Sequence, residues 1–232
     1  MKKICSLCCI WICLALLFTS CKKDDYVYPP VQQDFLTVFS GSDGALETLL
    51  TDKGERYTVT EDLSKSRISA NSSARVVSNF ETLSSADKTV RIYGVLSPIS
   101  VAPLPPNSAP FVNGIKTDPV NMISIWMGRD YLNIILSIVM QEKKHSFHFV
   151  EEKVEYVQGT KVVTLLLYHD AGGDVESFSK RAYLSIPLRQ YFNPTDPNRK
   201  IVIRFKYWTR NREGVKVLET KYADNGFTYI PS

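Results

Sequence analysis

The stretch YLNIILSIVM, residues 131–140, alternates in hydropathy with a period of two. Every even-numbered position is apolar, whereas the odd-numbered positions include Tyr131, Asn133 and Ser137. Successive side chains of a β-strand point to opposite faces of a sheet, so this period predicts a strand with one face in a core and one mixed face.

Residues 201–208 repeat the pattern, with the apolar positions Ile201, Ile203, Phe205 and Tyr207. We expect further strands at residues 122–127, 146–150, 162–168, 181–186 and 216–221. Turn residues separate these stretches, and no amphipathic helix is convincing. Six or seven antiparallel strands in this arrangement predict a β-sandwich over residues 120–232.

The first half of the chain predicts a smaller all-β domain. Five short strands are expected at residues 35–39, 47–51, 56–60, 75–83 and 89–97, and Gly54 supplies the glycine that a tight hairpin favours. Five short strands in this length predict a small OB-like barrel over residues 34–104. Residues 105–119 are rich in proline, which removes backbone donors, so we expect a linker there.

The five cysteines all lie in the first 21 residues. This position excludes a disulfide framework, a cysteine-ligated metal site and a cysteine nucleophile from the rest of the chain. Hydrophobic residues make up 44% and charged residues 22% of the 232 residues, as in an average globular protein. The composition therefore argues against disorder and against a protein with many membrane spans.

The first 20 residues have the pattern of a secretory signal peptide. Lys2 and Lys3 precede an apolar run of about 15 residues, which is shorter than a membrane-spanning helix needs. Thr19-Ser20-Cys21 resembles a bacterial lipobox, although Phe18 stands where leucine is commoner. We expect cleavage before Cys21 and attachment of acyl chains such as palmitate to it, because two or three chains hold a protein on a membrane durably.

Residues 21–33 are expected to form a lipidated tether, since they contain Pro29-Pro30 and no apolar periodicity. The sequence Lys22-Lys23-Asp24-Asp25 has two interpretations. It is either a solvated spacer, or it resembles the charged signals that follow the lipidated cysteine in surface-exposed lipoproteins of Bacteroidota. We expect an outer-membrane lipoprotein, with its exposure at the cell surface left open.

Several motifs together resemble the NigD-like lipoproteins of Bacteroidota. In the first half the resemblance rests on the hairpin LLTDKGERYTVT at residues 49–60. In the second half it rests on Tyr131-Leu132-Asn133-Ile134, Lys144-His145, the stretch LLLYHDAGGD at residues 165–174, and Leu184-Ser185-Ile186. The resemblance implies an OB-type barrel followed by a β-sandwich on a lipid anchor. The family's name comes from a member associated with bacteriocin production, which implies an immunity role, and no catalytic residues carry over.

The three histidines do not predict a metal site. His145 and His148 are three apart, so a strand sends them to opposite faces, and His145 should share a face with Phe147 and Phe149. We interpret His169 and Asp170 as structural residues that close a hairpin by side-chain to backbone hydrogen bonds.

Asp170, Asp174 and Glu176 are the best candidates for a calcium site, but their spacing does not match an EF-hand loop. We interpret them as solvated turn acids. The nucleophile elbow, the P-loop and the dinucleotide fingerprint are all absent from the sequence, so we expect neither a cofactor nor an enzyme.

The run from Arg199 to Lys216 contains seven Lys and Arg residues against one acid, Glu213. Strand alternation puts four of its residues on one side, and we call these the basic face: Arg204, Lys206, Trp208 and Arg210. A tryptophan beside cations could stack on a ring while the cations hold an anion. In the alternative interpretation the aliphatic stems of the cations cover Trp208 and the face is merely solvated.

Removal of Lys2 and Lys3 with the signal peptide leaves 26 Lys and Arg against 24 Asp and Glu, so a nucleic-acid partner is not expected. We expect a non-enzymatic, lipid-anchored envelope protein that binds an anionic glycan or a protein partner. An immunity-type surface lipoprotein is the alternative, and a glycan-active hydrolase is a further one. The sequence leaves the oligomeric state open.

Overall fold

The computed structural model describes residues 28–196, 199–221 and 226–231. All of the strands in it belong to one compact unit, Val31–Ser232. The predicted signal peptide, Cys21 and the segment Lys22–Asp25 lie outside the described residues. Among the residues described, no helix has the length and hydropathy to span a membrane.

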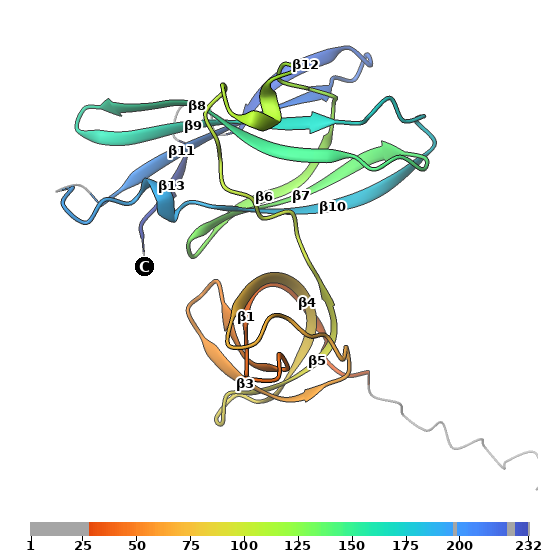
Figure 1. The fold of residues 1–232 in the computed structure, drawn as a ribbon, viewed down its shortest axis with the longest axis vertical. Helices are drawn as coiled ribbons and strands as arrows, with labels where there is room; N and C mark the ends of the chain where they lie inside the picture. The colour runs from red at the N-terminus through yellow and green to blue at the C-terminus, as the bar shows by residue number, and fades with distance from the viewer. Residues whose placement is uncertain (1–27, 197–198, 222–225, 232) are drawn as a thin grey trace, which may run out of the picture. The chain divides into compact units, whose positions relative to one another are not determined.

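The first five strands close into a barrel in the order β1-β2-β3-β5-β4 (Figure 1). Their bounds are β1 Gln32–Ser40, β2 Leu46–Thr51, β3 Arg56–Asp62, β4 Ser73–Ser84 and β5 Thr89–Leu96. Closure pairs every strand on both sides, which leaves no open sheet edge. Leu36, Val38, Leu49, Val90 and Ile92 fill the interior and are completely buried. The five predicted strands and the barrel are confirmed.

The hairpin between β2 and β3 closes as its sequence predicts. Gly54 adopts φ +87°, a value that favours glycine, and its N–H donates to the carbonyl of Thr51. The Thr51 N–H donates in turn to the carbonyl of Glu55 at 2.9 Å. These bonds leave Asp52 at the tip of the hairpin with its carboxylate free to reach another part of the chain.

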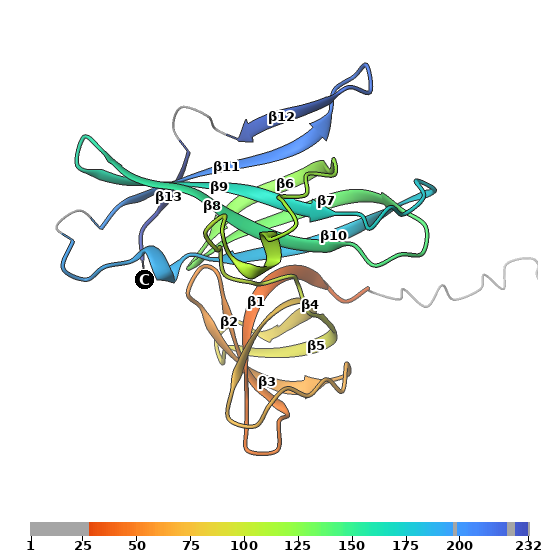
Figure 2. The ribbon, with the colours of Figure 1, turned by 45° about the horizontal axis from the view of Figure 1, so that its top comes forward.

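The second half forms two sheets (Figure 2). One has the order β10-β7-β6, and the other has the order β12-β11-β9-β8 with β13 added beside β11. The bounds are β6 Asn121–Gly128, β7 Tyr131–Met140, β8 Ser146–Val157, β9 Thr160–Asp170, β10 Phe178–Pro187, β11 Ile201–Arg210, β12 Lys216–Lys221 and β13 Phe227–Tyr229. The predicted all-β class is confirmed, although β9 and β11 pair in parallel rather than antiparallel.

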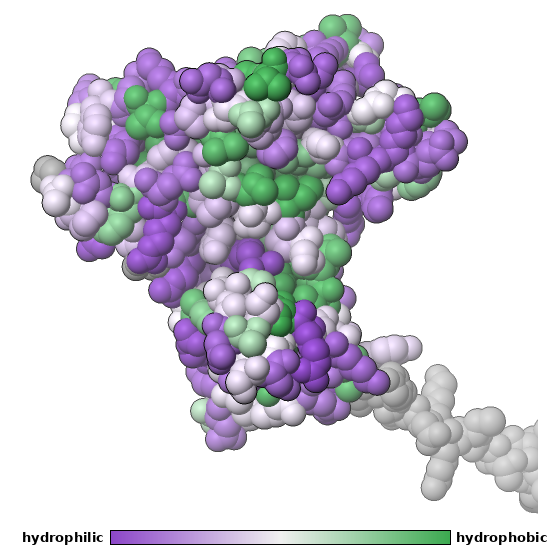
Figure 3. All heavy atoms as spheres, in the orientation of Figure 1, coloured by the Kyte–Doolittle hydropathy of each residue, from purple (hydrophilic) through white to green (hydrophobic). Residues whose placement is uncertain are grey.

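Strand periodicity positions the sandwich core as predicted. In β7, Leu132, Ile134, Leu136 and Ile138 are between 0 and 5% exposed. In β11, buried residues alternate with half-buried ones from Ile201 onward. Both sets belong to one hydrophobic cluster that the two sheets enclose. On the face drawn in Figure 3, hydrophobic residues are scattered among hydrophilic ones.

The chain between β5 and β6, which includes the proline-rich residues 105–119, packs along the sandwich. Ile99 forms a bridge with Leu184 at the edge of β10, and Leu104 forms one with Val150 at the edge of β8. The 3₁₀ turn η1, Ala109–Phe111, then buries Phe111 against the same sheet. The non-proline residues between the prolines keep their N–H groups, which make these bonds.

A buried polar group joins the barrel to the sandwich, and we call its four residues the junction cluster: Asp52, Arg75, Asn133 and Ser185. Arg75 of β4 donates to both carboxylate oxygens of Asp52, at 2.7 and 2.6 Å. Its guanidinium also donates to Ser185 Oγ at 2.9 Å and to Asn133 Oδ1 at 3.0 Å. Asn133 and Ser185 are completely buried, and the Arg75 side chain is 4% exposed.

The junction cluster is tightly enclosed. Asn133 Nδ2 donates to Asp52 Oδ2 at 2.7 Å, and the Arg75 guanidinium lies 4.1 Å from the centre of the Tyr131 ring. A side chain at Gly128 would place its Cβ 2.0 Å from Asp52 Oδ2, so only glycine fits there. The charges are therefore compensated by one specific set of hydrogen bonds.

Candidate functional site

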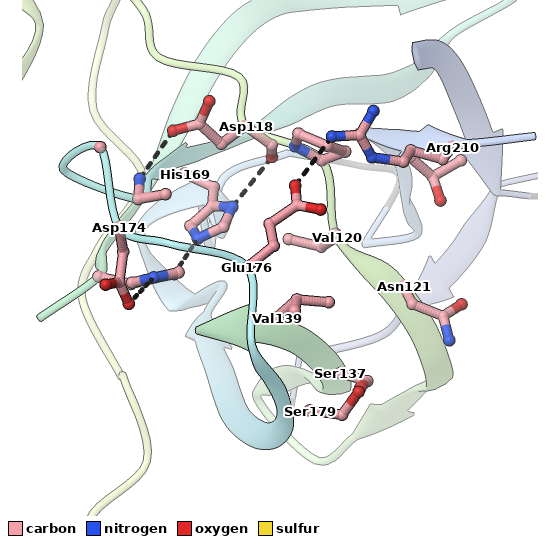
Figure 4. Close-up of a pocket in the computed structure, with 15 residues that line it drawn as sticks. Asp118, Val120, Asn121, Ser137, Val139, His169, Asp174, Glu176, Ser179 and Arg210 are labelled. Carbon is pink, nitrogen blue, oxygen red and sulfur yellow. Dashed lines mark hydrogen bonds and ion pairs between the residues drawn. The ribbon is translucent and has the colours of Figure 1, made fainter. Parts of the chain in front are cut away.

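A cavity of about 490 Å³ lies at one end of the sandwich, and we call it the end pocket (Figure 4). It is bounded by the starts of β6 and β10, the ends of β7 and β11, and the loop between β9 and β10. Its polar lining includes Asn121, Ser137, Ser179, Glu176 and Arg210, and its apolar lining includes Val120 and Val139. This volume is in the range that holds small ligands.

Strand pairing gathers the neutral polar groups of the end pocket. Asn121 of β6 lies opposite Ser137 of β7, and Ser179 of β10 lies opposite Val139 of β7. Within the part of the chain that the structure describes, the side chains of Asn121, Ser137 and Ser179 make no hydrogen bond. Their donors and acceptors therefore remain for solvent or a ligand.

Two histidines form one wall of the end pocket. His169 Nδ1 lies 2.9 Å from the carbonyl oxygen of Asp118, and because a carbonyl only accepts, this nitrogen carries the hydrogen. His169 Nε2 then accepts from Nδ1 of His145 at 2.9 Å. The other nitrogen of His145, Nε2, lies 3.4 Å from Asp174 Oδ2 and is buried.

Asp174 ties the loop before β8 to the loop after β9. Its carboxylate accepts from the N–H of Gln141 at 2.7 Å, of Glu142 at 3.3 Å and of Val175 at 3.0 Å. Desolvation opposes its ionisation, but these backbone donors outweigh it and hold the pKa of the carboxyl well below its ordinary value. Asp174 is therefore a buried, ionised link between two loops.

The interpretation of the three acids as solvated is wrong for Asp174, whose side chain is 2% exposed. Sequence spacing could not show that the loop from β7 to β8 would bring two N–H groups, those of Gln141 and Glu142, to it. Asp170 accepts from Gly172 within its own turn at 2.8 Å, as expected for a hairpin-closing residue. Glu176 pairs with Arg210 at 2.9 Å. The three carboxylates therefore do not converge on one point, and no cluster of three metal-ligating residues occurs among the described residues.

The predicted separation of His145 and His148 is confirmed. His148 contacts Phe111 and Tyr168. His145 instead contacts His169, whose ring stacks on Phe147 with the ring centres 4.6 Å apart. The meeting of His145 with His169 was not predicted. It depends on the register of β8 and β9, which places Phe147 opposite His169.

Acidification is expected to weaken the fold through His169. Burial lowers the pKa of its imidazole, so as pH falls below about 6.5 the unfolded chain takes up a proton that the folded protein resists. Stability is fully present above that pH and is lost below it, with a slope of at most about 1.4 kcal/mol per pH unit for this proton. Urea denaturation between pH 7.5 and 5 should show a shallower loss for His169→Gln than for the wild type. Equal slopes for the two proteins would contradict this role, since His145 and His148 are common to both.

The basic face lies on β11, where Arg204, Lys206 and Trp208 share one side as predicted. Each of its cations has a carboxylate beside it. Lys206 Nζ lies 2.7 Å from Glu152, and Arg204 and Arg210 pair with Glu155 at 3.9 Å and Glu176 at 2.9 Å. The positive charge of the basic face is therefore largely neutralised in space. Anion binding at this face stays a prediction.

Trp208 packs against the small cluster around Phe111 and Val150, and Lys216 Nζ lies 4.9 Å from the centre of its ring. The ring is half-buried. This packing is the arrangement that the alternative interpretation describes, in which neighbouring side chains cover the tryptophan.

Known proteins resemble this chain over almost the whole described length. A family model described as the NigD-like C-terminal beta sandwich domain matches residues 102–222. The chain belongs to the NigD-like family. A solved NigD-like immunity protein from Bacteroides caccae is 44% identical, with a TM-score of 0.81 over 89% of this chain and 100% of that chain.

More distant solved structures share the fold alone. A candidate toxin-related protein from Parabacteroides distasonis is 17% identical, with a TM-score of 0.63 over 86% of this chain and 93% of that chain. A candidate lipoprotein from Bacteroides fragilis is 9% identical, with a TM-score of 0.57 over 83% of this chain and 97% of that chain. No curated protein matches the chain.

The motifs that carry the NigD-like resemblance converge in two buried polar groups. Asp52, Asn133 and Ser185 come from three of these motifs and meet in the junction cluster. His145, His169 and Asp174 come from the other two and meet at the wall of the end pocket. The recognisable parts of the sequence are thus the parts that fix loops and domains in place.

Proposed function

We propose that this NigD-like chain is a lipid-anchored protein of the bacterial cell envelope that binds a ligand without catalysing a reaction. The observation that carries the binding role is the end pocket, where Asn121, Ser137 and Ser179 present polar groups that the described fold does not use. Lipidation at Cys21 rests on the sequence, as does placement in the outer membrane.

The chemistry of the end pocket favours a neutral, hydroxyl-rich ligand such as a saccharide. Among its lining residues Glu176 and Arg210 neutralise each other, and the neutral polar groups without a hydrogen bond in the described structure include the hydroxyls of Ser137 and Ser179 and the amide of Asn121. These groups both donate and accept hydrogen bonds, as sugar hydroxyls do. Asp118 and Asp174 accept backbone N–H bonds and Glu176 pairs with Arg210, so each acid of the pocket already has a partner, which argues against the glycan-active hydrolase at this site.

A glycan array tests the site. The variant Ser137→Ala/Ser179→Ala removes both hydroxyls without adding bulk to the pocket, and each lost bond to a ligand is worth about 0.5–1.5 kcal/mol. We expect this variant to lower the affinity for the glycans that the wild type retains by about fivefold or more. The matched control is Arg204→Ala/Trp208→Ala on the basic face, which should leave the profile unchanged. If the control loses glycan binding and the serine variant keeps it, the binding site lies on the basic face. If neither variant changes the profile, both sites are rejected.

Bacteriocin immunity is the second candidate function. It is favoured by the 44% identity to a protein named as a NigD-like immunity protein. An immunity protein of this kind would intercept a toxin at the cell surface. Deletion of the gene should then raise sensitivity to a bacteriocin from a neighbouring strain, whereas a glycan binder would leave that sensitivity unchanged.

A further inference from the structure

A second hollow opens at the side of the sandwich, and we call it the side groove. β10 and β8 are edge strands of the two sheets, so the core between the sheets is open along this side. The segment from Ile99 to Leu104 crosses from the edge of β10 to the edge of β8 and covers part of the opening. The part beyond this segment remains open, with a volume of about 470 Å³.

The floor of the side groove is apolar because it is the margin of the sandwich core. Ile138 and Phe147 are 5% and 7% exposed, and Met140 and Ala182 are half-buried against the same core cluster. An apolar chain laid here would extend the core and remove apolar surface from water.

The rim of the side groove is cationic. Lys143, Lys144, Lys180 and Arg181 line it, and Glu142 is the one carboxylate among its lining residues in the described structure. Within the described residues, Lys144, Lys180 and Arg181 have no carboxylate partner, whereas the cations of the basic face all have one. The positive charge available for a ligand thus lies here rather than on β11.

We propose that the side groove binds a single-chain anionic amphiphile, a fatty-acid-like carboxylate with its chain on the apolar floor and its headgroup among Lys144, Lys180 and Arg181. A concave hollow of this volume accommodates one small molecule, whereas a membrane presents a flat surface that does not enter it. His145 is the one residue that the linings of the side groove and the end pocket share in the described structure, so substitutions at their other residues test the two binding roles separately.

Calorimetric titration of the mature chain, residues 21–232 with Cys21→Ser to prevent lipidation, tests the proposal. Laurate and dodecyl maltoside, both below micellar concentrations, carry the same chain with a charged and a neutral headgroup. We expect the affinity for laurate to exceed that for dodecyl maltoside by about tenfold or more. Added salt should lower the affinity for laurate, because exposed charges are screened. Equal affinities of the two probes, or no laurate binding, would overturn the proposal.

Charge reversal locates the site. Lys144→Glu/Lys180→Glu/Arg181→Glu should weaken laurate by about fivefold or more. The control Lys53→Glu/Lys116→Glu/Arg212→Glu makes the same charge change at exposed positions elsewhere and should bind as the wild type does. A second variant, Ala182→Ile, narrows the floor without altering charge and should also weaken laurate. Equal loss in the control, or unchanged binding in both test variants, would contradict the placement.

Vesicles separate a free amphiphile from a membrane surface. Two proteins are compared, both carrying Cys21→Ser: one has no other change and the other carries Lys144→Glu/Lys180→Glu/Arg181→Glu. We expect equal fractions of the two proteins to sediment with phosphatidylglycerol vesicles. If sedimentation is lower for the triple variant and added laurate does not reduce it for the other protein, the groove binds a lipid bilayer and the proposal is overturned.

Discussion

Replacing Arg75 with methionine is expected to lower the free energy of unfolding by about 3–5 kcal/mol. The substitution removes the guanidinium but keeps much of the aliphatic stem. It leaves Asp52 as a largely buried carboxylate without its cation, and it leaves Asn133 and Ser185, both completely buried, without the donors that Arg75 supplied. The cost comes mainly from these stranded groups rather than from the net value of the ion pair.

Denaturation by guanidinium chloride, followed by the fluorescence of Trp126 and Trp208, measures this change. Arg67→Met is the matched control, since Arg67 also pairs with an aspartate, Asp43, but both side chains are more than 60% exposed. It should cost no more than about 1 kcal/mol. If Arg75→Met and Arg67→Met have equal effects, the junction cluster does not hold the barrel and sandwich together.

A double variant separates the two causes of the loss. Arg75→Met with Asp52→Leu removes both charges at once, so no unpaired ion remains in the buried site. We expect it to recover part of the stability lost in Arg75→Met alone. A double variant less stable than the single one would show that the stranded carboxylate of Asp52 is not the main source of the loss.

The strands could be predicted from the sequence because alternation is a local property. The stretch 131–140 shows its buried face by its own spacing, and the turn at Gly54 shows the β2–β3 hairpin. The parallel pairing of β9 with β11 could not be predicted in this way, because it depends on the path of the chain between them.

The sites depended on contacts between distant residues, and these were missed. Three acids outside the run neutralise cations within it: Glu152 and Glu155 on β8, and Glu176 after β9. Glu152 is 54 residues from its partner Lys206, and Glu176 is 34 residues from its partner Arg210. A charge count over the run from Arg199 to Lys216 cannot include them. The junction of Asp52 with Asn133 likewise spans 81 residues, and the shared motifs are the one signal in the sequence that points to it.

Replacing Cys21 with serine is expected to release the protein completely from the membrane fraction. A serine hydroxyl does not take the place of the thiol that accepts the diacylglyceryl group, and without two or three acyl chains no durable attachment remains. Fractionation of cells that express wild type or Cys21→Ser measures the effect. The matched control is Cys13→Ser, within the predicted signal peptide, which should leave the protein in the membrane fraction.

Proteinase K added to intact cells distinguishes the two interpretations of Lys22–Asp25. Digestion of the wild-type protein in intact cells indicates an outward-facing lipoprotein. Protection in intact cells with digestion after lysis indicates a solvated spacer on an inward-facing one.

The intact mass of the wild-type protein, purified from its own membranes, tests the anchored mature form most directly. We predict a mass equal to residues 21–232 plus a diacylglyceryl group and an amide-linked acyl chain on Cys21. The mass of all 232 residues, or of a cleaved chain without lipid, would contradict the assignment of this NigD-like chain as a lipid-anchored envelope protein.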